Sequence, residues 1–367
     1  MYHVTIKHIM KIFIKVLIAL IFVSICSWLY IHFIGIGTKI DFSKTDDSAH
    51  IVNNMNSGDL DGAISDADKS VAKYKNNEQA LVLLALAYQQ KGSLTFQEVS
   101  YSAKSLEVAD EILKINPNSG DAYRIKGYAY EMVQNYTESE TNYKKALELA
   151  PSDAMAHANL GHAYELQSKD ELAINGYKDA LAINPDFVPA LLGMMRYSYN
   201  NNNKTELKTY AEKVLSLAPD VTSKSDAEQM LGFVYQSEKN LSEASKHFDN
   251  AISFEPKSAA VYVSRANNNL LIMSGEKDNG KRSVSVKEIF DDADNAIKLD
   301  PNLSEAYLLW ARLAPSLQNP KEAATHFYNE VLKKVDVDIT LSKAEKESMK
   351  NLILSEMKSE SIKITQS

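Results

Sequence analysis

Three residues in the middle of the chain have types and spacing that could serve metal binding or acid–base chemistry. His157 and His162 lie five residues apart, not the four that place two ligands on one face of a helix. His162 and Glu165 lie three residues apart and would share a helical face. A metal site there is the weaker interpretation, and we predict neither a metal ligand set nor a catalytic residue.

A second candidate is the polar segment GEKDNGKR at residues 275–282. It resembles a calcium- or phosphate-binding loop only faintly. It lacks the alternating carboxylates and the distal glutamate of an EF-hand loop, and it lacks the Gly-Lys-Ser/Thr ending of a P-loop. We therefore predict a solvated turn between two helices, and no cofactor.

The composition is that of an ordinary globular protein with an uneven distribution of charge. Of the 367 residues, 45% are hydrophobic and 24% are charged, and the 13 glycines and 9 prolines are too few for an all-β or disordered chain. Residues 1–40 carry four lysines and no acidic residue, so the remainder holds 36 basic and 48 acidic side chains. An acidic body repels phosphate backbones, which argues against nucleic-acid binding.

The N-terminal region contains an apolar run long enough to cross a membrane. Residues 16–37 include no Lys, Arg, Asp or Glu. A helix of this length extends about 33 Å, enough for a hydrocarbon core of about 30 Å. Trp28 and Tyr30 suit the membrane interface. The lysines in residues 1–15 favour a cytoplasmic stub, so we expect a single-pass signal anchor with the body in the periplasm or outside the cell.

Two other interpretations of this run stay open. The small residues Gly35 and Gly37 would allow cleavage of a signal peptide, which would release a soluble periplasmic protein. A lipoprotein signal is disfavoured because Cys26 follows Ile25, where such sites need a small residue. Cys26 is the only cysteine, so the body has no disulfide.

The rest of the chain repeats a pattern at a regular interval. Residues 126–151 read KGYAYEMVQNYTESETNYKKALELAP, and residues 160–185 read LGHAYELQSKDELAINGYKDALAINP. Small residues at facing positions let two helices approach within about 8–10 Å, and a proline ends the second helix. The shared residues are Gly127 and Gly161, Tyr130 and Tyr164, Tyr143 and Tyr177, Ala146 and Ala180, and Pro151 and Pro185.

This pattern resembles the tetratricopeptide repeat, whose 34-residue unit is a helix–turn–helix. The resemblance implies an all-α fold, a right-handed α-solenoid, preceded here by one N-terminal transmembrane helix. Residues 338–367 would form a capping helix and tail, with an apolar stripe of Met349, Leu352, Ile353 and Met357. The array at residues 44–337 would hold about seven to eight units: 44–77, 78–119, 120–153, 154–187, 188–224, 225–258, 259–303 and 304–337.

The resemblance leaves no separate domain for a catalytic core, which implies that the protein is not an enzyme. His157 falls at repeat position 4, normally a packing position, so we expect this histidine in the core.

In this family, the first helix of each unit lines a concave groove through repeat positions 2, 5, 9 and 12, which share one helical stripe. Aromatic side chains there offer rigid apolar area, and Asn and Gln can pair with a peptide backbone. Capture of a chaperone's C-terminal carboxylate is disfavoured, because Arg124 and Tyr128 replace the Lys and Asn of the chaperone-binding members. The implied peptide-binding groove consists of Arg124, Tyr128, Asn159, His162, Arg196, Tyr199, Gln229, Phe233, Gln236 and Asn267.

These observations predict a membrane-anchored adaptor or scaffold that binds an extended segment of a partner protein. The expected setting is bacterial envelope-complex assembly or protein export, by analogy of fold. The alternatives are a cytosol-facing membrane receptor for protein targeting, which needs the opposite orientation, and a soluble periplasmic repeat protein. The expected partners are a protein or peptide and the membrane, and a homo-oligomer is left open.

Overall fold

The computed structural model describes residues 47–94, 97–218, 220–275, 286–313, 320–338, 341 and 343–359. These residues form seventeen α-helices and no strand. Contacts divide the chain between Ser223 and Lys224, which gives an N-terminal body with α2–α11 and a C-terminal body with α12–α18. In chain order the helices are α2 (Ser48–Ser57), α3 (Leu60–Lys73), α4 (Glu78–Leu94), α5 (Glu98–Ile115), α6 (Gly120–Met132), α7 (Tyr136–Leu149), α8 (Ala154–Glu165), α9 (Asp170–Ile183), α10 (Val188–Asn200), α11 (Lys204–Leu217), α12 (Val221–Ser237), α13 (Leu241–Phe254), α14 (Ala259–Gly275), α15 (Val286–Leu299), α16 (Ser304–Leu313), α17 (Pro320–Val337) and α18 (Lys343–Ser359).

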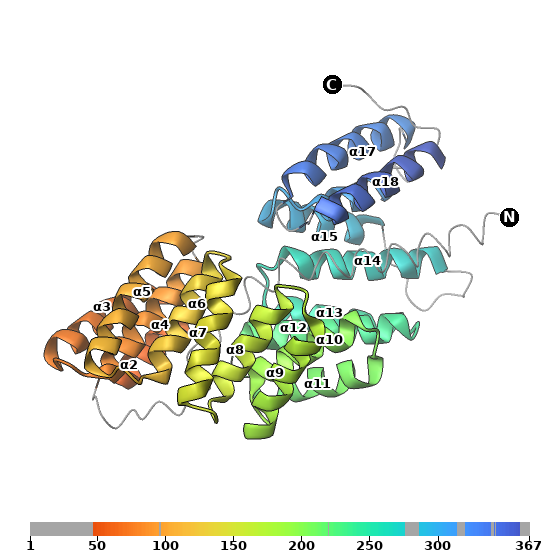
Figure 1. Cartoon of the computed structure of the whole chain (residues 1–367). Coiled ribbons are helices and arrows are strands. Elements are labelled where there is room, and N and C mark those ends of the chain that lie inside the picture. The colour runs from red at the N-terminus through yellow and green to blue at the C-terminus, as the bar shows by residue number, and fades with distance from the viewer. Residues whose placement is uncertain are drawn as a thin grey trace. The chain divides into compact units, whose positions relative to one another are not determined.

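The N-terminal body is a stack of helix pairs (Figure 1). In each pair the first helix packs against the second helix that follows it in the chain. The first helices also contact one another in order, from α2 through α4, α6 and α8 to α10. They therefore form a continuous inner wall, with the second helices outside it. The predicted all-α solenoid is confirmed for the described residues.

The turns inside the helix pairs share a feature that the sequence analysis missed. The residue at repeat position 15 adopts a left-handed conformation, with φ between 55° and 63°, at Gln134, Ser168, Asn202 and Lys239. In three of these units the next residue is an asparagine whose side chain accepts the backbone N–H of a glutamate three residues later. Such caps fix the start of the second helix. The capping pairs are Asn135 with Glu138, Asn203 with Glu206, and Asn240 with Glu243.

Glycine at repeat position 8 lets the two helices of a unit approach closely. A Cβ on Gly127 would lie 2.6 Å from the ring of Tyr143, and a Cβ on Gly232 would lie 2.5 Å from the ring of Phe248. The aromatic ring of the second helix thus occupies the space that a side chain would need. The predicted facing of a small residue and a large one is confirmed in these two units.

Each body has its own apolar core. The core of the N-terminal body includes Leu83, Ile112 and Tyr177, and the core of the C-terminal body includes Ile289 and Leu309. The alanines expected at the helix contacts are buried in both cores. Burial of these faces, rather than helix propensity alone, holds the repeats together.

The first helix of the C-terminal body begins earlier than the spacing predicts. Helix α12 starts at Val221, four residues before the expected Ser225. The side chain of Asp220 accepts the backbone N–H of Ser223 at 2.7 Å, which caps the helix at this earlier point.

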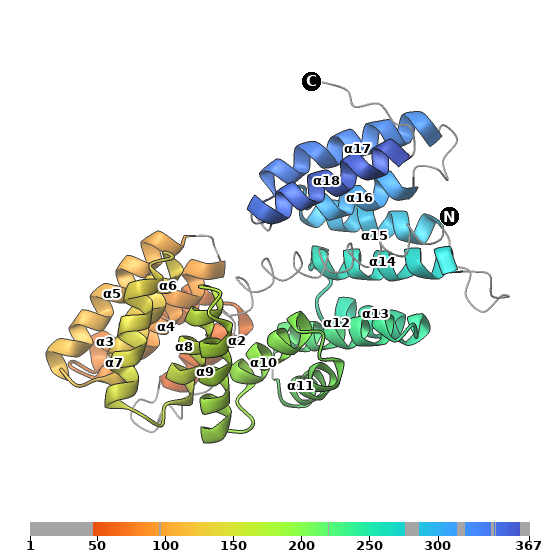
Figure 2. The same ribbon diagram turned by 45° about the vertical axis from the view of Figure 1, so that its right-hand side comes forward.

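The last helix, α18, packs against α17 (Figure 2). Its predicted apolar stripe is buried at Met349, Ile353 and Met357, and Leu352 is half-buried. This helix therefore covers the face of α17 that a further repeat would otherwise cover.

Two predicted features lie outside the described residues. The first is the N-terminal stub and apolar run at residues 1–37, which includes Cys26. The second is most of the polar segment at residues 275–282. Among the helices that the structure describes, none combines the length and the apolar character needed to cross a membrane.

Candidate binding surface

The ten candidate residues all lie on first helices, and nearly all are covered. Nine of them are at most 9% exposed, and Gln236 is half-buried. They belong to the packed interior of the wall more than to an open row of side chains. By helix, they are Arg124 and Tyr128 on α6, Asn159 and His162 on α8, Arg196 and Tyr199 on α10, Gln229, Phe233 and Gln236 on α12, and Asn267 on α14.

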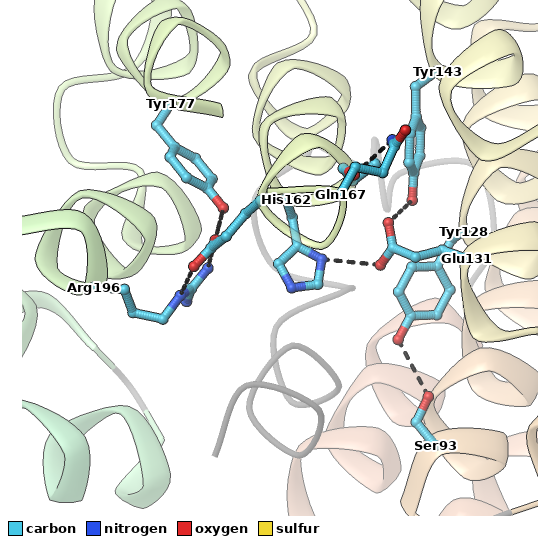
Figure 3. Close-up of polar contacts among 10 residues, drawn as sticks. Ser93, Tyr128, Glu131, Tyr143, His162, Gln167, Tyr177 and Arg196 are labelled. Atoms are coloured by element: carbon cyan, nitrogen blue, oxygen red, sulfur yellow. Dashed lines mark hydrogen bonds and ion pairs between the residues drawn. The ribbon is translucent and has the colours of Figure 1, made fainter. Parts of the chain in front are cut away.

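A buried carboxylate, Glu131, joins α6 to α8. Its Oε1 atom lies 3.0 Å from Nδ1 of His162, and the two side chains are 5% and 6% exposed. Its Oε2 atom accepts a hydrogen bond of 3.4 Å from the Tyr143 hydroxyl on α7. Figure 3 shows both groups directed at this carboxylate. Because a carboxylate removed from water needs polar partners, these two contacts stabilise it at the junction of two units.

The same arrangement recurs one unit later around Glu165. Arg196 donates from Nε to one carboxylate oxygen at 3.0 Å and from Nη2 to the other at 2.8 Å, a two-point contact. The Tyr177 hydroxyl donates to Glu165 at 2.5 Å and accepts from Arg196 at 3.1 Å. Burial raises the pKa of Glu165, but the charge and hydrogen bonds of Arg196, aided by His162 and Tyr177, outweigh burial and lower this pKa to about 2.

Both clusters follow one rule of repeat position. The glutamate stands at position 12, a tyrosine 12 residues later lies in the same unit, and the basic partner 31 residues later stands at position 9 of the next unit. Glu131 and Glu165 fall at repeat position 12, which the repeat pattern assigns to the inner stripe, but sequence reasoning did not connect them to His162 and Arg196. An acidic residue at position 12 followed by a basic one at position 9 of the next unit is the signal that would have found these pairs.

A related cluster stands at the end of the C-terminal body. Arg312 on α16 donates to Glu356 on α18 at 2.6 Å, and the Tyr328 hydroxyl on α17 donates to the same carboxylate at 3.0 Å. Here the final helix, not a repeat, supplies the glutamate. The capping helix is therefore attached by the same three residue types that join α8 to α10.

Arg124 and Tyr128 are also engaged within the N-terminal body. Nη2 of Arg124 donates to Asp121 at 2.5 Å, and its Nε lies 3.5 Å from a carboxylate oxygen of Asp153. The Tyr128 hydroxyl shares a hydrogen bond of 3.2 Å with Ser93 on α4, which Figure 3 includes. Burial raises the pKa of Tyr128, so this phenol stays protonated.

In the C-terminal body, the candidates on α12 make neutral contacts. Nε2 of Gln229 donates to the hydroxyl of Ser264 on α14 at 2.8 Å. Nε2 of Gln236 donates to Oδ1 of Asn268, also on α14, at 3.3 Å. Successive first helices are therefore joined here through amides and a hydroxyl group.

Phe233 and Asn267 complete this part of the surface. The Phe233 ring packs edge-on against Phe248 of α13, with ring centroids 5.4 Å apart. Asn267 is 9% exposed, so it is largely covered like the other candidates.

His157 corrects one expectation. Its ring is half-buried, and Nε2 lies 3.0 Å from the carbonyl oxygen of Pro151 in the turn before α8. The prediction of a core histidine is wrong because this local contact holds the ring at the end of the helix. Within the described part of the chain, no three His, Cys, Asp or Glu side chains are grouped as they would be around a metal ion.

Comparison with known proteins identifies the repeat directly. Residues 134–168 match the family model of the TPR repeat. The match runs from the turn before α7 to the turn after α8 and so includes His162 and Glu165. The described chain has the tetratricopeptide-repeat fold. No curated protein matches the sequence.

Solved structures with this fold are similar along much of the chain. A chain of the APC/C hetero-tetramer Cut9–Hcn1 gives a TM-score of 0.61 at 15% identity, over 80% of this chain and 52% of that one. This protein therefore spans about half the length of that relative. The pilF protein of Pseudomonas aeruginosa gives 0.50 at 20% identity, over 63% and 96% of the two chains. PilW, a widely conserved type IV pilus biogenesis factor, gives 0.50 at 16% identity, over 63% and 97%.

Proposed function

We propose that the protein is an adaptor that holds an extended segment of a partner protein against its first helices. The observation that carries this proposal is the continuous wall of first helices from α2 to α10, each in contact with the next. A wall of parallel stripes repeats the same surface in every unit, which suits an extended chain more than a compact ligand. We propose no catalytic role for the protein.

The chemistry of the partner follows from charge and from the described side chains. The acidic body disfavours nucleic acid. Around α12 and α14, the partly accessible groups include the amide of Gln236, which is half-buried. Amides pair with the N–H and C=O groups of a peptide backbone, so the partner is best sought among proteins with an extended or unfolded segment.

We further propose that residues 16–37 anchor the protein in a membrane, with the repeat body outside the cytoplasm. The apolar run and the lysines before it support this orientation. The similarity in fold to pilF and PilW supports a setting in the assembly of an envelope complex, such as a pilus or a secretion system. A cytosol-facing receptor needs the opposite orientation, and cleavage of residues 1–37 would leave a soluble periplasmic protein.

Site-specific photo-crosslinking in living cells tests the adaptor role. The probes replace Pro189 and Gln236, which are half-buried on first helices of the two bodies, and the control probe replaces exposed Lys239. Tyr128 and Phe233 are poor probe sites because they are at most 8% exposed. The same protein captured from either first-helix probe, and absent from the control, would support the proposal. Silence at both probes in a folded, abundant protein would refute it.

The location of the captured partner tests the orientation. A periplasmic or secreted partner supports an extracytoplasmic body, whereas a cytosolic partner supports the receptor alternative. Fractionation of the membrane with the full-length chain, compared with a variant lacking residues 1–37, tests the anchor separately.

A further inference from the structure

Glu305 is a buried carboxyl group in the first turn of α16. Its side chain belongs to the interior of the C-terminal body, and the residue is 4% exposed. Its Oε1 atom has no hydrogen-bond partner among the described residues. A buried carboxylate without a partner is strongly destabilising, so this position favours the neutral acid.

A second buried carboxylate, Asp338, is hydrogen-bonded to Ser304, the residue directly before Glu305. Asp338 directly follows α17 and is 1% exposed. One of its oxygens accepts the backbone N–H of Ser304 at 3.0 Å and the Ser304 hydroxyl at 2.8 Å. These two bonds attach the end of α17 to the start of α16, and the carboxylate lies at the positive end of the α16 dipole.

Three charged groups, Asp338, Arg312 and Glu345, act electrostatically on Glu305. Asp338 at the end of α17 and Glu345 on α18 oppose a second negative charge, and Arg312 on α16 favours it. Arg312 already donates a hydrogen bond of 2.6 Å to Glu356. Burial first, and then Asp338, raise the pKa of Glu305 to about 8, with Arg312 opposing and Glu345 adding to the rise.

The direction of the effect on stability follows from proton binding. The ordinary pKa of a glutamate is about 4.3, so the folded body binds this proton more tightly than the unfolded chain does. The C-terminal body therefore loses stability as the pH rises from about 4.3 towards the folded-state value. Above that value, Glu305 carries a negative charge in a buried site, where the carboxyl group of Asp338 opposes that charge.

We propose that Glu305 and Asp338 form a proton-dependent latch, which holds the start of α16 to the end of α17 while Glu305 is protonated and releases it when the proton is lost. Release frees the N-terminal turn of α16 and loosens the connection from α17 to α18. Since Arg312 and Tyr328 bind α18 through Glu356, loosening at this point reaches the capping helix. The latch is independent of the proposed adaptor role.

Hydrogen exchange of the full-length chain between pH 6 and pH 9 tests the latch, after correction for the intrinsic exchange rate at each pH. In the wild type, we expect the hydrogen-exchange protection of the peptide that covers the start of α16 to fall about tenfold or more. The reason is that one extra proton bound in the folded state changes the unfolding equilibrium about tenfold for each pH unit between the two pKa values. Glu305→Gln should retain protection across this range. The matched control, Glu347→Gln, removes an exposed carboxylate from α18 and should behave as the wild type does.

Two results would overturn the latch. One is an equal loss of protection in Glu305→Gln and the wild type, and the other is a wild type whose protection does not change with pH. If Glu305→Gln does not fold, Asp338→Asn serves as the second variant. Its amide oxygen can still accept from Ser304, and without the neighbouring charge the pH-dependent loss should shrink.

Infrared spectroscopy of the wild type gives a measure that needs no variant. A protonated buried carboxyl group should give a carbonyl band at neutral pH that disappears in alkaline solution while the helices stay folded. Absence of this band at neutral pH would overturn the proposal.

Discussion

The two bodies join their first helices by different chemistry at equivalent repeat positions. In the N-terminal body, α8 and α10 are joined by the ion pair of Glu165 and Arg196. In the C-terminal body, α12 and α14 are joined by the amide contact of Gln236 with Asn268. The glutamate and the glutamine both stand at repeat position 12, so the fold accommodates either a charged or a neutral side chain at this position.

This difference affects how strongly the first helices of each body are held to one another. A buried charge must keep its partner, because a lone charge in the interior is strongly destabilising. A buried amide loses less when its partner leaves, and it can pair again with an incoming group. The wall of α6–α10 is therefore expected to be the more rigid of the two, and we propose that a partner held along the first helices depends more on the side chains of α12–α14 than on the paired charges of α6–α10.

The largest expected effect is loss of the Arg196 charge. Arg196→Met leaves Glu165 without its cation, and the helices α8–α10 should lose about 3 kcal/mol of local stability, the low end for a broken buried pair because Glu165 keeps some exposure. Hydrogen exchange in this region measures the loss. Gln229→Met, which breaks the contact with Ser264 in the other body, should cost only about 1 kcal/mol.

A double variant decides whether the ion pair itself is responsible. Glu165→Gln combined with Arg196→Met replaces both charges by groups of similar size. The double variant should be clearly more stable than the sum of the two single losses predicts, because no unpaired charge remains. Simple additivity would show that Arg196 acts through packing alone, and the charged contact would then not distinguish the two bodies.

The two bodies should also respond to pH in opposite directions. The pKa of Glu165 is lowered to about 2, so its contribution to stability is present above its ordinary pKa and is lost as the pH falls from there towards 2. The pKa of Glu305 is raised to about 8, so the C-terminal body loses stability as the pH rises. Each group contributes at most about 1.4 kcal/mol for each pH unit in its window.

Fluorescence separates these two responses. Trp310 lies in the C-terminal body, and the only other tryptophan is Trp28, so a Trp28→Phe background reports on that body alone. Trp310 emission should change on the alkaline side, and Glu305→Gln should abolish that change. Circular dichroism should detect the acid-side loss, and Glu165→Gln should reduce it. A C-terminal body that unfolds first in acid would contradict the assignment.

The architecture could be predicted from the sequence because its causes are steric and local. Because Gly127 packs against Tyr143, a small and a large residue must stand at a fixed separation in the sequence. The recurrence of that separation in unit after unit specifies a stack of helix pairs. Among the left-handed turn residues, Gln134 and Lys239 escaped prediction because their residue types do not favour this conformation. Their geometry is imposed by the helices on either side.

The candidate surface could be predicted only in part. Helical periodicity places Arg196 and His162 on the inner stripe, but it says nothing of how tightly the next helix covers them. Their partners, Glu131 and Glu165, come from the preceding unit, and recognising that pairing requires the distance between successive first helices. Polar residue type suggested accessibility, whereas mutual neutralisation allows the same residues to be buried.

A smaller effect tests the packing of the N-terminal body. Gly176 on α9 faces the backbone of α8, where an added Cβ would lie 2.8 Å from Cα of Gly161. Gly176→Ala should therefore cost about 1–2 kcal/mol, since backbone cannot move aside as a side chain can, and the gain in helix propensity offsets part of the strain. Gly275 on α14 is the control, because nothing lies within 4 Å of a Cβ added there. Gly275→Ala introduces no clash, and equal losses in both variants would argue against a closer backbone approach in the N-terminal body.

The smallest effect on stability should accompany the largest effect on binding. Gln236→Ala removes a half-buried amide whose contact with Asn268 is 3.3 Å long, so the loss of stability should stay below about 1 kcal/mol. If the wall of α12–α14 is where the partner binds, the same change should sharply reduce the yield of crosslinks from a probe at Leu270, which is half-buried on α14. Arg196→Met should show the reverse, a large loss of stability in α8–α10 with crosslinks from Leu270 retained. Crosslinks that depend on Arg196 and not on Gln236 would contradict this expectation. They would place the binding surface on the α6–α10 wall of the N-terminal body.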